Sequence, residues 1–145
     1  MTVDEVIKVW TTALRSGKYE QGRWKLRDDN KFCCLGVLAD VLTDGKCWET
    51  LTVDDGLPPR DLYLPASIQT KALLTSDSGG FSVFDSSEKL KKVLKKLFDC
   101  DDVACTVEAF VGRFGTSLSE LNDTGASFAI IADIIEAKPE GLFVE

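Results

Sequence analysis

The chain has 145 residues, of which 44% are hydrophobic, and a formal net charge of −7. This size and composition predict one soluble globular domain spanning residues 1–145. The chain contains no histidine, which excludes serine triads, cysteine–histidine hydrolases and HExxH metal sites, and its acidic balance argues against generic binding of duplex DNA.

The N-terminal residues are acidic where a signal peptide would be positively charged, and no apolar run is long enough to cross a membrane. We therefore expect a cytoplasmic protein whose five cysteines are reduced. No CxxC pair is present, so we expect neither a structural metal nor a cofactor. Because no imidazole can act as a base, we also expect the protein not to be an enzyme.

The first part of the chain predicts two helices. Thr2 and Glu5 have the spacing of a capping box in front of apolar residues at helical spacing, and Gly17 supplies the stop. Residues 34–42 are nearly all apolar, which is typical of a central, buried helix. Within this second helix, Gly36 would let a neighbouring segment approach closely.

Between the two helices, residues 18–32 predict short extended pieces around an Asp-Asp-Asn turn, with residues 31–33 returning antiparallel. Strand alternation would place Trp24 and Leu26 on one face of this segment and the neighbouring cations on the other. The segment therefore predicts a small hairpin-like sheet.

The remainder of the chain is less regular. Residues 48–53 and 81–84 favour short strands, and Pro65 favours the start of a short helix. Two longer helices are predicted at residues 88–98, with lysines opposite an apolar stripe, and at residues 128–137 after a short helical turn. The expected architecture is α+β, with four or five helices and a small antiparallel sheet.

The main functional signal is a local reversal of charge. Six of the 17 Lys and Arg residues lie in the window 15–31 against three acids, so the window has a net charge of +3 and the remainder carries −10. Cationic side chains bind phosphate, and aromatic rings stack on bases. The window predicts a site for an anion with a planar part, made of Lys18, Tyr19, Arg23, Trp24, Lys25 and Arg27. The alternative interpretation is an ordinary hairpin, with Trp24 in the core and the cations merely solvated.

Two segments resemble a known family. ALRSGKYEQGRWKLRDDNKFCCLGVLADVL is similar to the "ALRSG-Y-QG…LR…CCLGVL" opening of a family of small proteins encoded by tailed bacteriophages, and SLSELNDTGASFAIIADIIE is similar to that family's "L-LND-G-SF-IAD-IE" segment. The resemblance covers about a third of the chain and implies a viral origin rather than a particular activity. We expect one core to join the two segments, formed by Trp10, Phe32, Leu35, Leu38, Leu121, Phe128 and Ile131.

A small viral protein without catalytic groups is expected to act by occupying a target. The first interpretation is sequestration of an anionic, nucleotide-like signal of host immunity in the host-cell cytoplasm. The second is inhibition of a host protein through the acidic surface; mimicry of DNA ranks third, because two basic clusters interrupt that surface. We expect no membrane partner, and we expect a homo-oligomer, most simply a dimer, because the apolar residues 141–144 would otherwise be exposed.

Overall fold

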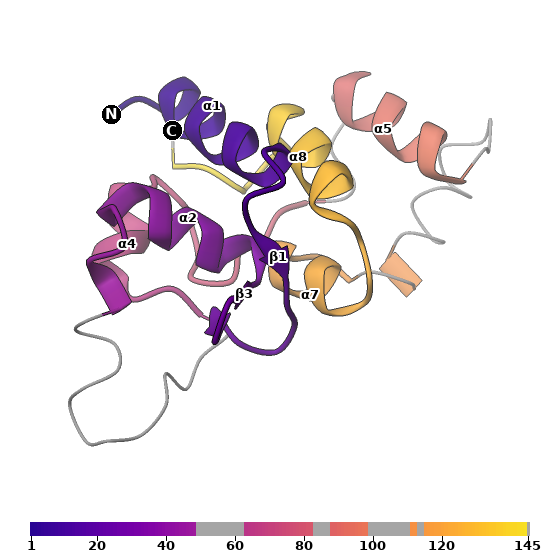
Figure 1. Cartoon of the computed structure of the whole chain (residues 1–145). Coiled ribbons are helices and arrows are strands. Elements are labelled where there is room, and N and C mark those ends of the chain that lie inside the picture. Colours follow the sequence, from indigo (N-terminus) through magenta and orange to yellow (C-terminus); the bar gives the residue numbers. More distant parts are fainter. Residues whose placement is uncertain (49–62, 83–87, 99–110, 113–114, 145) are drawn as a thin grey trace.

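The computed structural model describes residues 1–48, 63–82, 88–98, 111–112 and 115–144, without the side chains of residues 94 and 96–98. Helices α1, α2, α7 and α8 gather around one core, with the small sheet beside α2 (Figure 1). The named elements, in chain order, are α1 (Val3–Arg15), β1 (Glu20–Gln21), β2 (Arg27–Asp28), β3 (Lys31–Phe32), α2 (Cys34–Thr43), α4 (Ala66–Lys71), α5 (Glu88–Phe98), α7 (Leu118–Asp123) and α8 (Phe128–Glu136).

Local capping signals set both ends of α1 as predicted, and a serine cap sets the start of α8. The Thr2 hydroxyl accepts the Glu5 backbone N–H at 3.2 Å, and the Glu5 carboxylate accepts the Thr2 N–H at 2.7 Å, which is a complete capping box. Gly17, with φ +77°, follows α1 in a left-handed conformation that suits glycine. At α8 the Ser127 hydroxyl accepts the Ile130 N–H.

Gly36 in α2 confirms the predicted close approach of a neighbouring segment. A Cβ built on Gly36 would lie only 1.7 Å from the carbonyl oxygen of Leu26, so no other residue fits without moving the backbone. The same Leu26 oxygen accepts the Cys33 N–H at 3.2 Å. Residues 23–27 are therefore held against the first turn of α2.

The three strands form a sheet in the order β1-β3-β2. Strands β2 and β3 pair antiparallel around the predicted turn, but β1 pairs parallel with β3, so the sheet is mixed rather than purely antiparallel. The reason is that the chain leaving α1 runs alongside β3 in the same direction, where the Gly22 N–H donates to the Phe32 carbonyl at 2.8 Å. The α+β class is confirmed, with six helices rather than four or five in the described part.

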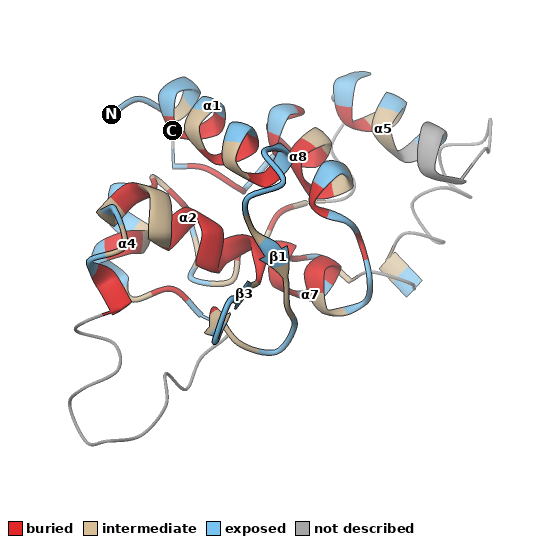
Figure 2. Cartoon of the chain, in the orientation of Figure 1, coloured by how far each residue is buried: buried red, intermediate tan, exposed pale blue. Residues whose placement is uncertain are grey.

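The core joins the N-terminal helices α1 and α2 with the C-terminal helices α7 and α8. Helix α1 packs along α8, and α2 contacts both α1 and α7, so their apolar faces turn toward one another (Figure 2). Of the predicted core residues, only Phe32 is merely half-buried, and it packs against the core. The others are buried: Trp10, Leu35, Leu38, Leu121, Phe128 and Ile131.

Residues 141–144 pack on their own chain. Phe143 bridges Leu74 in an antiparallel pairing, and the Val144 N–H donates to the Leu73 carbonyl at 2.7 Å. Leu142 and Phe143 are buried as a result. Val144 stays 52% exposed, so the burial of Leu142 and Phe143 removes only part of our reason for expecting a homo-oligomer, and the dimer stays a prediction.

The structure bears on several other expectations, some of which fall partly outside the described residues. Trp48 lies in a short helical turn rather than a strand, and residues 49–53 lie outside the described residues. The strand expected at 81–84 is absent from its described residues 81–82, while 83–84 are outside the description. Helix α5 has the predicted bounds, and its Leu90 is buried. No helix among the described residues is long and apolar enough to span a membrane.

Candidate functional site

Trp24 lies on the surface rather than in the core. Its side chain is 66% exposed, whereas Leu26 is 1% exposed, so the two do not share a face as predicted. The strand alternation fails because residues 23–26 form bends and Trp24 has φ +73°, in the left-handed region that a bulky residue rarely adopts. This exposure also contradicts the alternative interpretation that Trp24 is a core residue.

The backbone of Trp24 is held by helix α7. Its N–H donates to the Asp123 carboxylate at 2.9 Å. The neighbouring Arg23 reaches over the turn after α7, because a Cβ built on Gly125 would lie 3.4 Å from an Arg23 terminal nitrogen. The loop that carries the exposed indole is therefore fixed to the C-terminal end of α7.

Three of the predicted cations lack acidic partners among the described residues. Within the described part of the chain, the side chains of Lys18, Arg23 and Lys25 make no hydrogen bond or ion pair. Lys18 and Arg23 are exposed, and Lys25 is half-buried. Lys31, by contrast, pairs with Glu20 at 3.8 Å. The loop at residues 23–25 thus offers two cations to a ligand, Arg23 and Lys25, while Lys18 precedes β1.

Tyr19 is engaged within the fold. Its hydroxyl donates to the Asp40 carboxylate at 2.5 Å, and its ring meets Phe32 edge-on with the centroids 5.0 Å apart. Burial, the hydrogen bond to Asp40 and the charge of Asp40 raise the pKa of Tyr19 to about 12. This ring is a packing element rather than a free stacking surface.

Arg27 belongs to the same cluster as Tyr19. Its guanidinium lies 5.3 Å from the centroid of Phe32 and 5.5 Å from that of Trp48, and its Nε donates to the Asp29 carbonyl at 2.8 Å. Its two terminal nitrogens make no hydrogen bond to any described residue. The six predicted residues thus divide between the exposed loop Arg23–Lys25, a packed cluster of Tyr19 with Arg27, and the exposed Lys18 before β1.

Asp40 holds the packed cluster together, a role that the sequence analysis missed. One carboxylate oxygen accepts the Tyr19 hydroxyl, and the other accepts the Trp48 indole N–H at 2.8 Å. The available signal was an isolated acid in an otherwise apolar helix. A half-buried carboxylate in such a position needs hydrogen-bond donors, and tyrosine hydroxyls and indole N–H groups can supply them.

Asn122 is the second residue that the sequence analysis missed. It is fully buried, and its Nδ2 donates to the Gly22 carbonyl at 2.7 Å. Its Oδ1 accepts the Gln21 side-chain amide at 2.9 Å and the Cys34 N–H at 3.2 Å. The Asn122 side chain therefore connects residues 21–22 and the start of α2 to α7. The Leu-Asn-Asp pattern was the available signal in the sequence.

A family model described as "Domain of unknown function (DUF8296)" matches residues 2–139. The chain belongs to this family. No curated protein and no solved structure matches the chain. The family match spans both segments joined by Asn122, and it says nothing about a viral origin.

The described cysteines of this DUF8296 chain are ill-suited to act as nucleophiles. Burial raises the pKa of Cys33 to about 11 and that of Cys34 well above its usual value, so both thiols stay protonated at neutral pH. Cys33 also serves as the N-cap of α2, and the Cys34 thiol contacts the Leu118 carbonyl at 3.4 Å. Cys47 is buried as well, while Cys100 and Cys105 lie outside the described residues.

Proposed function

We propose that this protein is a non-enzymatic binding protein that captures an anionic, nucleotide-like ligand on the loop Arg23–Lys25, with Lys18 as a further cation. The observation that carries the proposal is the exposed Trp24, held in place by its backbone and flanked by cations without acidic partners in the described structure. An exposed indole is a stacking surface for a base, and the cations suit phosphate groups. This positive loop in a chain of net charge −7 favours a local anion site over a generally basic surface.

The residues divide the work of binding. Stacking of a base on Trp24 should contribute about 1–3 kcal/mol. Each charge-assisted contact from Arg23 or Lys25 should contribute about 1.5–3 kcal/mol. Arg27, steadied between two rings, offers its terminal nitrogens to a further phosphate oxygen, while Tyr19 supports the loop from the packed cluster.

The resemblance to small tailed-phage proteins supplies a biological setting. In that setting the protein acts in the host-cell cytoplasm, where it withholds a nucleotide signal from a host defence effector. Binding without turnover fits a chain that has no histidine and whose described thiols are buried. A two-fold dimer would place two such loops in one particle.

A second candidate function is inhibition of a host protein. An exposed tryptophan next to an arginine is also typical of the residues that dominate protein–protein interfaces. Trp24 and Arg23 have that character, and the acidic remainder of the surface could steer a basic partner. In this case free nucleotides would not bind.

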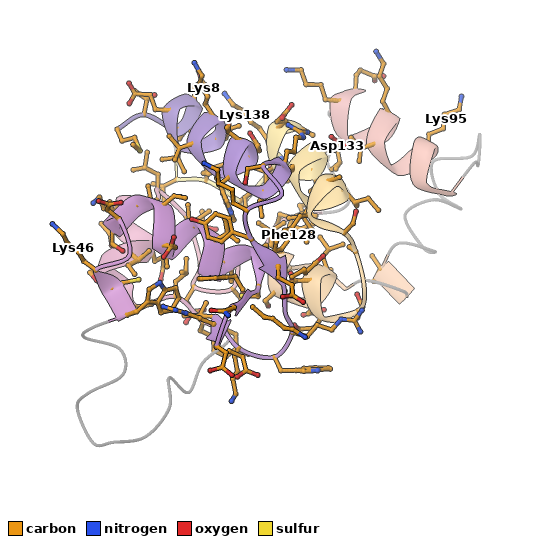
Figure 3. The ribbon with its side chains drawn as sticks, viewed as in Figure 1. Lys8, Lys46, Lys95, Phe128, Asp133 and Lys138 are labelled. Carbon is orange, nitrogen blue, oxygen red and sulfur yellow. The ribbon has the colours of Figure 1, made fainter. Side chains whose placement is uncertain are left out.

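Titration calorimetry with cyclic dinucleotides, cyclic trinucleotides and ADP-ribose derivatives tests the proposal. The variant Arg23→Ala with Lys25→Ala should weaken binding by about 100-fold or more. The matched control is Lys8→Ala with Lys46→Ala, which removes the same charge from exposed lysines elsewhere on the surface (Figure 3). If no ligand binds more tightly than about 100 µM, or if both double variants behave alike, the protein-inhibitor function replaces this one.

A further inference from the structure

The backbone conformation of Trp24 is unfavourable unless another part of the chain holds it. A bulky residue at φ +73° is strained relative to glycine, and an indole that is 66% exposed gains little from packing. The hydrogen bond from the Trp24 N–H to the Asp123 carboxylate offsets this strain. Asp123 lies 99 positions later in the sequence. A charged acceptor makes this bond stronger than a neutral one.

The residues before Trp24 are fastened to the same part of α7. The Gln21 amide donates to Asn122 and to the Ala126 carbonyl, and the Gly22 carbonyl accepts the Asn122 amide. The Asn122 Nδ2 also lies 3.5 Å from the Asp123 oxygen that holds Trp24. The loop is therefore shaped by the C-terminal turn of α7 more than by its own sequence.

We infer that Asp123 is a positioning residue for the ligand site, because its carboxylate fixes the backbone that carries the Trp24 indole. The inference rests on the proposed function of the loop. The negative charge of Asp123 is unexpected there, because an acid next to the loop that carries Arg23 and Lys25 opposes an anionic ligand electrostatically. The hydrogen bond that this carboxylate accepts from the Trp24 N–H explains why an acid occupies the position.

Two substitutions separate the two effects. Asp123→Asn removes the charge and keeps a side-chain oxygen that can accept the Trp24 N–H. Asp123→Ala removes both. If charge alone mattered, both variants would bind an anion more tightly than the parent; if positioning matters, only Asp123→Asn will bind as tightly or more tightly, and Asp123→Ala will bind less tightly.

The first measurement needs no ligand. Amide hydrogen exchange of Trp24, followed by NMR, should be about tenfold or more faster in Asp123→Ala and close to the parent rate in Asp123→Asn. Asp28→Ala, which removes an exposed acid from the same segment, is the matched control and should leave this exchange unchanged. Equal exchange in the parent and in Asp123→Ala would overturn the inference.

The second measurement is calorimetric affinity, with cyclic dinucleotides and ADP-ribose as the probes. Tenfold weaker binding by Asp123→Ala, with Asp123→Asn at or above the parent affinity, is the expected result. Tighter binding by both variants would overturn the positioning role. If neither probe binds the parent but exchange at Trp24 responds as expected, the proposed function fails for these ligands while the role of Asp123 in shaping the loop stands.

Discussion

Replacing Asn122 by alanine tests how strongly the fold depends on one buried amide. The side chain is fully buried and bonds the Gly22 carbonyl at 2.7 Å and the Cys34 N–H at 3.2 Å. In the variant Asn122→Ala both backbone groups lose their partner. An unsatisfied buried polar group costs about 1–3 kcal/mol, so the two together should lower the free energy of unfolding by roughly 2–6 kcal/mol. That is a large part of the roughly 5–15 kcal/mol typical of a whole domain.

Urea denaturation followed by tryptophan fluorescence measures this change. Trp10 and Trp48 are buried and report on the core, and the slope with denaturant should remain that of the parent. The matched variant Thr124→Ala removes an exposed hydroxyl two positions on and should cost less than about 1 kcal/mol. A loss below about 1 kcal/mol for Asn122→Ala would refute the reasoning, because it would mean that the Gly22 carbonyl and the Cys34 N–H find other hydrogen-bond partners in the variant.

Two further predictions concern the core and the packed cluster. Leu38→Ala should lower the free energy of unfolding by about 2–5 kcal/mol, because Leu38 is fully buried; a loss under about 1 kcal/mol in urea denaturation would contradict this. The pKa of Tyr19 is raised to about 12 in the folded protein, so the unfolded chain loses this proton first and stability should fall as pH rises from about 10 toward 12. Urea midpoints across that range should depend less on pH in Tyr19→Phe, and an unchanged dependence would show that another group is responsible.

Much of the helical fold was predictable because its signals are local. Thr2 with Glu5 and Ser127 begin helices through bonds that span three residues, so the printed sequence contains all the partners. The close approach of another backbone segment to Gly36 was also predictable, because a glycine in a nearly apolar helix indicates backbone contact. The core followed from the apolar spacing of the same helices.

The loop was less predictable because its shape comes from distant residues. The left-handed backbone of Trp24 is held by Asp123, and strand alternation cannot anticipate such a contact. The parallel pairing of Glu20 with Lys31 likewise depends on where the chain lies after α1, rather than on turn residues. The cations could be picked out as a charge pattern, but which of them face solvent depends on packing that the sequence does not show.

The packing of α1 against α8 has a consequence for how the chain is made. Arg15 of α1 pairs with Asp133 of α8, 118 positions later in the sequence. At a synthesis rate of about 5–20 residues per second, α1 waits roughly 6–24 seconds for its partner to be made. During that time the apolar stripe containing Val6 and Trp10 has no α8 to cover it, so this surface of the nascent chain can be buried as in the fold only after α8 has been synthesised.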